Sequence, residues 1–269
     1  MIRSLHSLLI AAALVALPVA AMAEMERHTT EFDIRFGALP VGAAQFRISF
    51  DDKGYVLNAT GKTVGVANLF APGKGQVDSD GALADGRVIP AHNVVRLKEK
   101  KKKSMLEMAF ADGAVAEVAL TPDKPKKKRG RKWVPILPEQ LQSVIDPASG
   151  VIVPVAADRA SDPRAVCDRT LNIYDGDTRY DIALKYKFTK PVETDGYKGY
   201  AFVCQLRYIP VSGHKRKQRN IEYMTDNEDM EIWLAPMART NVFSPIRIEV
   251  PTWLGKVTAM SSYFGASRE

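Results

Sequence analysis

The feature that most constrains the fold of this sequence is an alternation of apolar and polar residues with a period of two. The alternation recurs in six segments along the chain: 32–36, 46–50, 106–110, 180–188, 230–234 and 246–250. A period of two places successive side chains on opposite faces of an extended backbone, so each segment is typical of a β-strand with one buried and one solvated face. The chain is therefore expected to be mostly β-structure.

Asp-Gly dipeptides punctuate the alternating segments. Five of them occur, at Asp80-Gly81, Asp85-Gly86, Asp112-Gly113, Asp175-Gly176 and Asp195-Gly196. Asp-Gly supplies the positive φ angles that tight hairpin turns require, so successive strands are expected to pair as antiparallel neighbours. Many short strands joined in this way predict a single antiparallel sheet that forms a partly closed, barrel-like or spiral structure.

Helix is expected at one place only. Residues 138–145 begin with Pro138 and are stopped by Asp146 and Pro147, which predicts one short helix. The preceding stretch, about 121–132, is rich in lysine and proline without periodicity, so it is expected to be an exposed loop. The same strand pattern runs on both sides of this loop, which favours a single β domain over residues 24–269.

The first 23 residues have the features of a secretory signal peptide. Arg3 is followed by an apolar core over residues 8–19 and by an A-x-A cleavage site at 21–23. The apolar core is too short to span a membrane, so we expect cleavage and export of the chain from Glu24 onward. No later apolar stretch approaches the ~20 residues of a membrane span, so none is expected in the mature chain.

The sequence contains two cysteines, Cys167 and Cys204. In an oxidising compartment, a single pair of cysteines most simply forms one disulfide. The alternative is a thiol–imidazole pair between Cys204 and His214, which free thiols would favour.

Signals for catalysis or for a metal site are weak. The sequence has no G-x-S-x-G nucleophile motif, and its three histidines after the signal peptide lie far apart. Asp175, Asp177 and Asp181 are close in sequence but lack the spacing of a calcium-binding loop. The chain is therefore not recognisable as an enzyme, and no cofactor or metal is expected.

The net charge of +7 is concentrated in three basic runs, the third at 215–219. The first two contain the candidate contacts to an anionic surface: Lys98, Lys100, Lys101, Lys102, Lys103, Lys126, Lys127, Lys128 and Arg129. Such a surface suits anionic lipid, lipopolysaccharide or another envelope polymer. Charge runs are more often solvated loops or charged edge strands that prevent edge-to-edge pairing, and this alternative stays open. Nucleic acid is not an expected partner, because the runs lack interleaved aromatic residues.

Several motifs together resemble a known family. They are SVIDPAS at 143–149, the stretch 167–180 with its Cys, Tyr-Asp-Gly and Arg-Tyr, AFVC at 201–204, IPVSG at 209–213, IWLAP at 232–236 and PIRI at 245–248. In this order they resemble the bacterial exported family catalogued as domain of unknown function 3108, over about residues 31–260. The resemblance implies a periplasmic or envelope protein with a curled, barrel-like sheet and paired cysteines, and it implies no established activity. The lysine-rich stretches at 98–103 and 124–132 do not belong to that pattern.

The leading functional hypothesis is a non-enzymatic periplasmic module of the cell envelope that binds a lipid, a glycan or an envelope protein in or on its sheet. The alternative is an envelope hydrolase acting on glycan or peptide bonds. That activity requires acidic groups, or a serine and a histidine, that converge in a pocket. A purely structural partner, which would carry a large exposed apolar patch, is a third hypothesis.

Overall fold

The fold is seen in a computed structural model of the chain, which describes residues 25–123, 130, 132–238 and 240–267. The expected signal peptide lies outside these residues. So do four of the candidate surface contacts, namely Lys126, Lys127, Lys128 and Arg129.

The described chain is mostly β-structure, with short helical segments in its connections. The strands are β1 (Glu26–Phe36), β2 (Leu39–Phe50), β3 (Gly54–Thr63), β4 (Gly73–Ala84), β5 (Arg87–Glu99), β6 (Lys102–Ala111), β7 (Ala114–Thr121), β8 (Val153–Pro154), β9 (Arg169–Tyr174), β10 (Arg179–Thr194), β11 (Tyr197–Ser212), β12 (Glu231–Pro236), β13 (Val242–Thr252) and β14 (Gly255–Ala266). The α-helices are α1 (Gly65–Phe70), α2 (Pro163–Cys167) and α3 (Arg219–Asp226), and the 3-10 turns are η1 (Pro138–Leu141), η2 (Ser149–Val151) and η3 (Ala157–Arg159).

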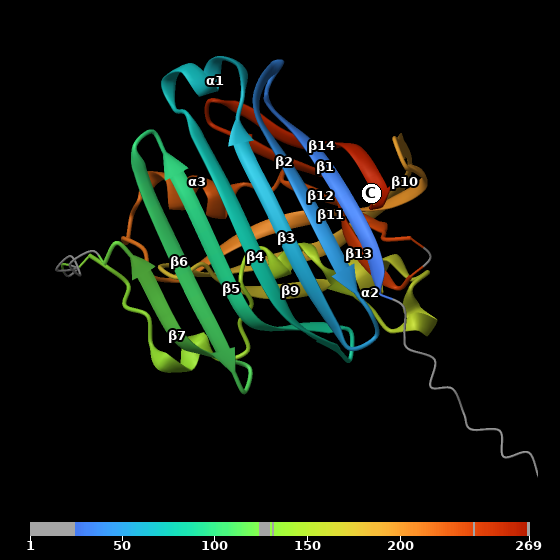
Figure 1. The fold of residues 1–269 in the computed structure, drawn as a ribbon, viewed down its shortest axis with the longest axis horizontal. Coiled ribbons are helices and arrows are strands. Elements are labelled where there is room, and N and C mark those ends of the chain that lie inside the picture. The colour runs from blue at the N-terminus through green and yellow to red at the C-terminus, as the bar shows by residue number, and fades with distance from the viewer. Residues whose placement is uncertain (1–24, 124–129, 131, 239, 268–269) are drawn as a thin grey trace, which may run out of the picture.

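The strands form one antiparallel sheet in the order β7-β6-β5-β4-β3-β2-β1-β14-β13-β12-β11-β10-β9, with β8 attached to β13. Most neighbours in the sheet are also neighbours in the chain, and the pairing of β1 with β14 joins the first strand to the last. The sheet curls, so that β1–β7 form a front layer and β9–β14 cross behind it (Figure 1). This confirms the mostly antiparallel, barrel-like fold that the alternation predicts.

The sheet stays open between its edge strands β7 and β9, and the segment 142–145 fills the gap. Gln142 bridges to Ala114 beside the start of β7, and Ile145 bridges to Ile173 in β9. The amide of Ile145 donates to the carbonyl of Asn172 at 2.8 Å. Unpaired edge strands expose backbone donors and acceptors, and this segment pairs with each edge at one position.

The space between the layers is filled by a hydrophobic cluster. Ile48 of β2 and Leu57 of β3 meet Val203 of β11, Ala235 of β12 and Phe264 of β14, all of them buried. These positions follow the period-two alternation, because every second side chain of a strand faces the same layer. Burial of this apolar surface is what holds the two layers together.

A second cluster surrounds the disulfide. Cys167 and Cys204 are bonded and fully buried, and they pack with Val166, Leu184 and Leu234. The predicted disulfide is thus confirmed. It ties the end of α2 to β11. Because the sulfur of Cys204 is bonded to that of Cys167, Cys204 has no free thiol to form the alternative pair with His214.

The helix expected between Pro138 and Ile145 is only one 3-10 turn, Pro138–Leu141. Ser143 has a φ of 53°, a left-handed conformation that cannot continue a helix. The residues after it are extended because they bridge the two sheet edges. The three α-helices have five to eight residues each, too short for the apolar stripe of period 3.6 that reveals a helix in a sequence.

Four of the five Asp-Gly dipeptides lie at turns, with their glycines at positive φ: Gly86, Gly113, Gly176 and Gly196. The fifth, Asp80-Gly81, lies inside β4, where the β4–β5 register shifts. A Cβ atom on Gly81 would meet the carbonyl oxygen of Ile89 at 2.2 Å. This glycine therefore permits a close approach of two strands instead of a turn.

Candidate functional site

A row of four lysines crosses the front layer. In the antiparallel register Lys62 of β3 pairs with Lys74 of β4, and Lys74 pairs with Lys98 of β5. Lys103 of β6 continues the row as the partner of Lys98. Directly opposed residues on one face of a sheet have Cβ atoms about 4.5–5.5 Å apart, so the four ammonium groups share one strip of surface. We call these four residues the lysine row.

The alternation of each strand decides that the lysine row faces solvent. In β3, Leu57 and Ala59 are buried in the core, so the even-numbered Lys62 points to the opposite face. In β4, Lys74 is an odd number of residues away from buried Ser79, so it lies on the outer face. In β5, Lys98 has the same relation to buried Asn93 and also lies on the outer face. All four lysines of the row are exposed.

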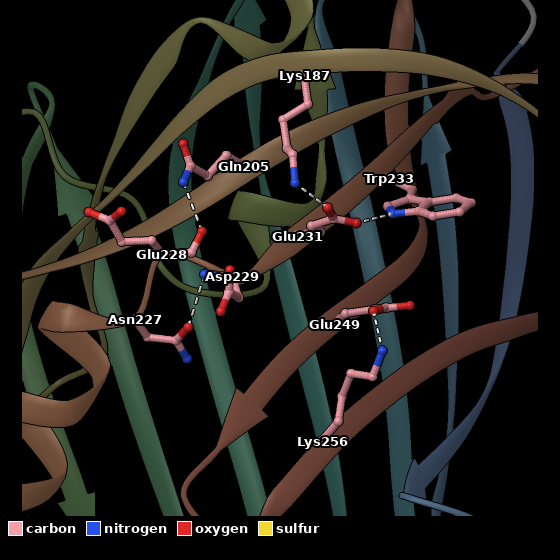
Figure 2. A network of polar contacts seen from close by, with 9 residues as sticks. All are labelled: Lys187, Gln205, Asn227, Glu228, Asp229, Glu231, Trp233, Glu249 and Lys256. Atoms are coloured by element: carbon pink, nitrogen blue, oxygen red, sulfur yellow. Dashed lines mark hydrogen bonds and ion pairs between the residues drawn. The ribbon is translucent and has the colours of Figure 1, made fainter.

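No lysine of the row forms an ion pair or a side-chain hydrogen bond with any residue that the structure describes. Two other lysines of the sheet are each paired with a glutamate. Figure 2 shows Lys187 of β10 donating to Glu231 of β12, and Lys256 of β14 donating to Glu249 of β13 at 2.8 Å. Like charges directly opposite each other destabilise a sheet, so the lysine row costs folding free energy that these pairs do not.

The lysine row borders a shallow groove of about 930 Å³ on the outer face of β1–β7. A second row of side chains, among them Gln45, Gln76 and Met105, forms its other side. Its β1 end is acidic, because it carries Glu31 and Asp33. The positive part of the groove is thus the stretch over β3–β6.

The structure divides the first basic run over one hairpin. Lys98 and Lys103 belong to the lysine row, Lys100 and Lys101 form the β5–β6 turn, and Lys102 pairs with Glu99 on the other face. Sequence reasoning missed the other two members, Lys62 and Lys74, because each is a single lysine outside any charge run. Only the register of β3, β4 and β5 places them beside Lys98.

A buried polar cluster surrounds Asp146, in the SVIDPAS motif. Its carboxylate accepts hydrogen bonds from the Asn93 amide at 2.8 Å, from the Ser79 hydroxyl at 3.1 Å and from the Ser149 hydroxyl. It also accepts the backbone N–H groups of Ala148 at 2.9 Å and Ser149 at 3.0 Å. The Tyr55 hydroxyl lies 2.6 Å from that of Ser149. The motif therefore fastens the segment that closes the sheet to β3, β4 and β5.

The chemistry of this cluster is structural. Burial raises the pKa of Asp146 above its ordinary value, while the hydrogen bonds from Ser149 and Ser79 act against that shift. Both Asp146 and Ser149 are fully buried, and the donors around the carboxylate are hydroxyl, amide and backbone groups. A hydrolase needs its nucleophile or acid at an accessible pocket, and this cluster does not provide one.

Within residues 25–123 and the later described ranges, no three His, Cys, Asp or Glu side chains gather in a way that would hold a metal ion. Every helix in the same part of the chain is too short or too polar to cross a bilayer.

The fold and the site together define a β-barrel-like protein with an uncompensated basic strip on its outer face. The chain belongs to the family described as Protein of unknown function (DUF3108), whose model matches residues 31–261. It is similar in structure to a β-barrel-like protein of domain of unknown function DUF1849 from Brucella abortus, with a TM-score of 0.52 and 10% sequence identity. That match covers 92% of this chain and 100% of the other, and at this identity it shows the fold alone. No curated protein matches the sequence.

Proposed function

We propose that this protein is a non-catalytic binding module of the bacterial cell envelope, and that its lysine row holds the phosphate groups of an envelope lipid or polymer. The observation that carries the proposal is the pairing of Lys62, Lys74, Lys98 and Lys103 across three consecutive ladders with no acidic partner in the described chain. A bound anion would turn this unfavourable arrangement into a favourable one.

The geometry favours a ligand with several anionic groups. Neighbouring strands lie about 4.8 Å apart, so four strands carry the row over roughly 15 Å. An ammonium group is a compact point charge with three rotatable donors, which suits phosphate oxygens presented in varied orientations. Long lysine stems bordering an open groove can adjust to such a series of groups.

The acidic end of the groove limits how the ligand lies. Glu31 and Asp33 on β1 repel an anionic chain, so the ligand is expected to lie over β3–β6 and to extend toward the β5–β6 turn. Lys100 and Lys101 in that turn are exposed and add to the positive potential there.

The test is isothermal titration of the protein with inorganic polyphosphate at low and at high salt. Replacing all four lysines of the row with glutamine (K62Q, K74Q, K98Q and K103Q) should weaken binding by about tenfold or more at low salt, because each lost phosphate contact also loses its counterion release. High salt should weaken the parent strongly and the variant little.

The matched control removes the same number of positive charges elsewhere. Lys53, Arg87, Lys185 and Lys198 are exposed and lie outside the groove. Their joint replacement by glutamine should leave the affinity within about twofold of the parent. Equal weakening in both variants would show that only net charge matters, and it would overturn the assignment of the site to the lysine row.

The envelope location is part of the same proposal, supported by the signal-peptide pattern of residues 1–23. Osmotic-shock fractionation of cells that express the full chain should release the protein with its first 23 residues removed, as intact mass spectrometry would show. A full-length protein in the cytoplasmic fraction would contradict it.

A further inference from the structure

We propose that the turns beyond the lysine row dock the protein onto a bilayer that contains anionic lipid, by inserting a set of exposed apolar side chains into its interface. We call this set the apolar tip: Leu39, Val66, Leu69, Phe70, Trp253 and Leu254. The inference rests on the proposed function, and it names lipid headgroups as the source of the phosphate groups.

Exposure of the apolar tip is the first observation. Phe70 is 80% exposed, Leu69 78% and Leu254 66%, which is unusual for side chains of this size. Helix α1 carries Val66, Leu69 and Phe70, and none of its residues is buried. A short helix is normally stabilised by packing its apolar side chains, and α1 leaves its largest side chains exposed instead.

The residues of the apolar tip come from three connections that lie side by side. Helix α1 packs on β2, and Gly65 begins it so close to Pro40 that a Cβ would lie 2.8 Å from the Pro40 carbonyl oxygen. The β1–β2 turn contacts the β13–β14 hairpin, where the amide of Gly37 donates to the carbonyl of Lys256 at 2.8 Å. Trp253 and Leu254 form the turn of that hairpin. The apolar tip is thus one patch at one end of the sheet, where Figure 1 shows α1.

The lysine row begins directly behind α1. Lys62 is one residue from the end of β3, and Lys74 is the second residue of β4, so α1 connects the two strands just beyond them. The amide of Lys100 donates to the carbonyl of Pro72 at 3.2 Å, which places the basic β5–β6 turn beside the exit of α1. At about 3.3 Å per residue, the row lies on the order of 10 Å behind the apolar side chains.

This arrangement matches the layers of a membrane interface. Amphipathic elements bury apolar side chains about 5–10 Å into the boundary between headgroups and acyl chains, and lysines beside them meet the anionic headgroups. Tryptophan is favoured at that depth, and Trp253 carries the guanidinium of Arg219 5.2 Å from its ring centroid. A second copy of the chain or an apolar protein on the apolar tip would not neutralise the lysine row beside it. The positive charge of the row therefore favours an anionic bilayer as the occupant.

The experiment is flotation of the purified protein with vesicles of phosphatidylethanolamine and phosphatidylglycerol. Replacing Leu69 and Phe70 with glutamine (L69Q and F70Q) should weaken vesicle binding by about tenfold or more, because two large apolar side chains no longer leave water. The same variant should bind inorganic polyphosphate like the parent. Weaker vesicle binding with unchanged polyphosphate binding would separate membrane insertion of the apolar tip from phosphate binding by the lysine row. Phosphate binding is tested separately by the variant with glutamine at all four lysines of the row.

Two controls make the measurement specific. Val56 and Ile89 are also exposed, and they line the second groove of the structure together with the β6–β7 turn, at the other end of the front layer. Their replacement (V56Q and I89Q) should leave vesicle binding unchanged. Brominated acyl chains should quench the fluorescence of Trp253, and the W253F variant should lose that quenched component. Circular dichroism of each variant verifies the fold.

Three outcomes would overturn the inference. If the variant with L69Q and F70Q bound vesicles as well as the parent, charge alone would hold the protein on the membrane. Absence of quenching would show that Trp253 stays outside the acyl region. A dimer in solution that this variant abolishes would show that a second copy covers the apolar tip.

Discussion

Lys74 of β4 and Lys98 of β5 are directly opposed across an antiparallel ladder, on the face of the sheet that meets solvent. A sheet selected for stability alone would place opposite charges, or uncharged β-branched residues, at such a pair. Lys62 and Lys103 extend the same conflict over two more ladders. The stability of this sheet and the use we propose for its surface therefore make opposite demands on the same residues.

The first prediction follows from this conflict. The variant with glutamine at all four positions of the lysine row should be more stable than the parent, by about 1 kcal/mol at low salt, because three like-charge pairs are removed. Urea unfolding followed by circular dichroism measures the difference, which should shrink at high salt.

The control for that prediction is K187Q. Lys187 donates to Glu231 in the network of Figure 2, so its replacement should leave stability unchanged or lower it slightly. A lysine-row variant less stable than the parent would mean that the four side chains stabilise the fold by packing on the groove.

The second prediction concerns the segment that closes the sheet. Asp146→Ala removes the acceptor from Asn93, Ser79 and two backbone amides inside the protein, which should cost about 3–5 kcal/mol. Hydrogen exchange should accelerate at the amides of Ile145 and Tyr174, which hydrogen-bond between the closing segment and β9.

Asp51 supplies the control for this substitution. Its carboxylate accepts the backbone N–H groups of Lys53 and Gly54 at an exposed turn. Asp51→Ala should therefore shift the unfolding midpoint much less. Equal shifts for the two variants would contradict a special role for the buried cluster.

The third prediction uses pH. His28 is buried against Phe264, and burial lowers its pKa from 6.5 to about 4. Below pH 6.5 the unfolded chain binds a proton at His28 that the folded protein does not bind. The stability that neutral, buried His28 contributes is therefore intact above pH 6.5 and is lost as pH falls toward 4. At pH 5 the loss should be about 2 kcal/mol.

The measurement is the difference in unfolding free energy between the parent and H28Q across this range. The difference should narrow as pH falls, because only the parent carries the histidine. Asp146 has a raised pKa in both proteins, so its opposite contribution cancels in the difference. Parallel pH profiles would contradict the assignment to His28.

The fourth prediction concerns the disulfide. Replacing Cys167 and Cys204 together with serine frees a loop that spans 37 residues, which should cost about 2–5 kcal/mol of stability. The oxidised parent and its reduced form should differ by a similar amount in urea unfolding. Equal stability of the two forms would show that the buried cluster around the bond holds α2 without it.

Local sequence patterns predicted much of this fold. The alternation at 180–188 lies within β10 and that at 246–250 within β13, because a period of two is a property of the extended backbone itself. The turn signal failed at Asp80-Gly81, where the dipeptide lies inside β4 and permits two strands to approach closely. The helix signal failed between Pro138 and Ile145, where contacts to both sheet edges override a local preference for helix.

The sequence by itself determined that alternating segments such as 180–188 and 246–250 are strands and which cysteines can pair, since these depend on side-chain periodicity and composition. Tertiary structure alone decided which strands are neighbours and in which register. That choice places Lys62 and Lys74 beside Lys98, and it brings Asp146 to Ser79 and Asn93. The reason is physical: alternation sets the face on which a side chain lies, whereas its neighbours on that face depend on pairings between segments far apart in the chain.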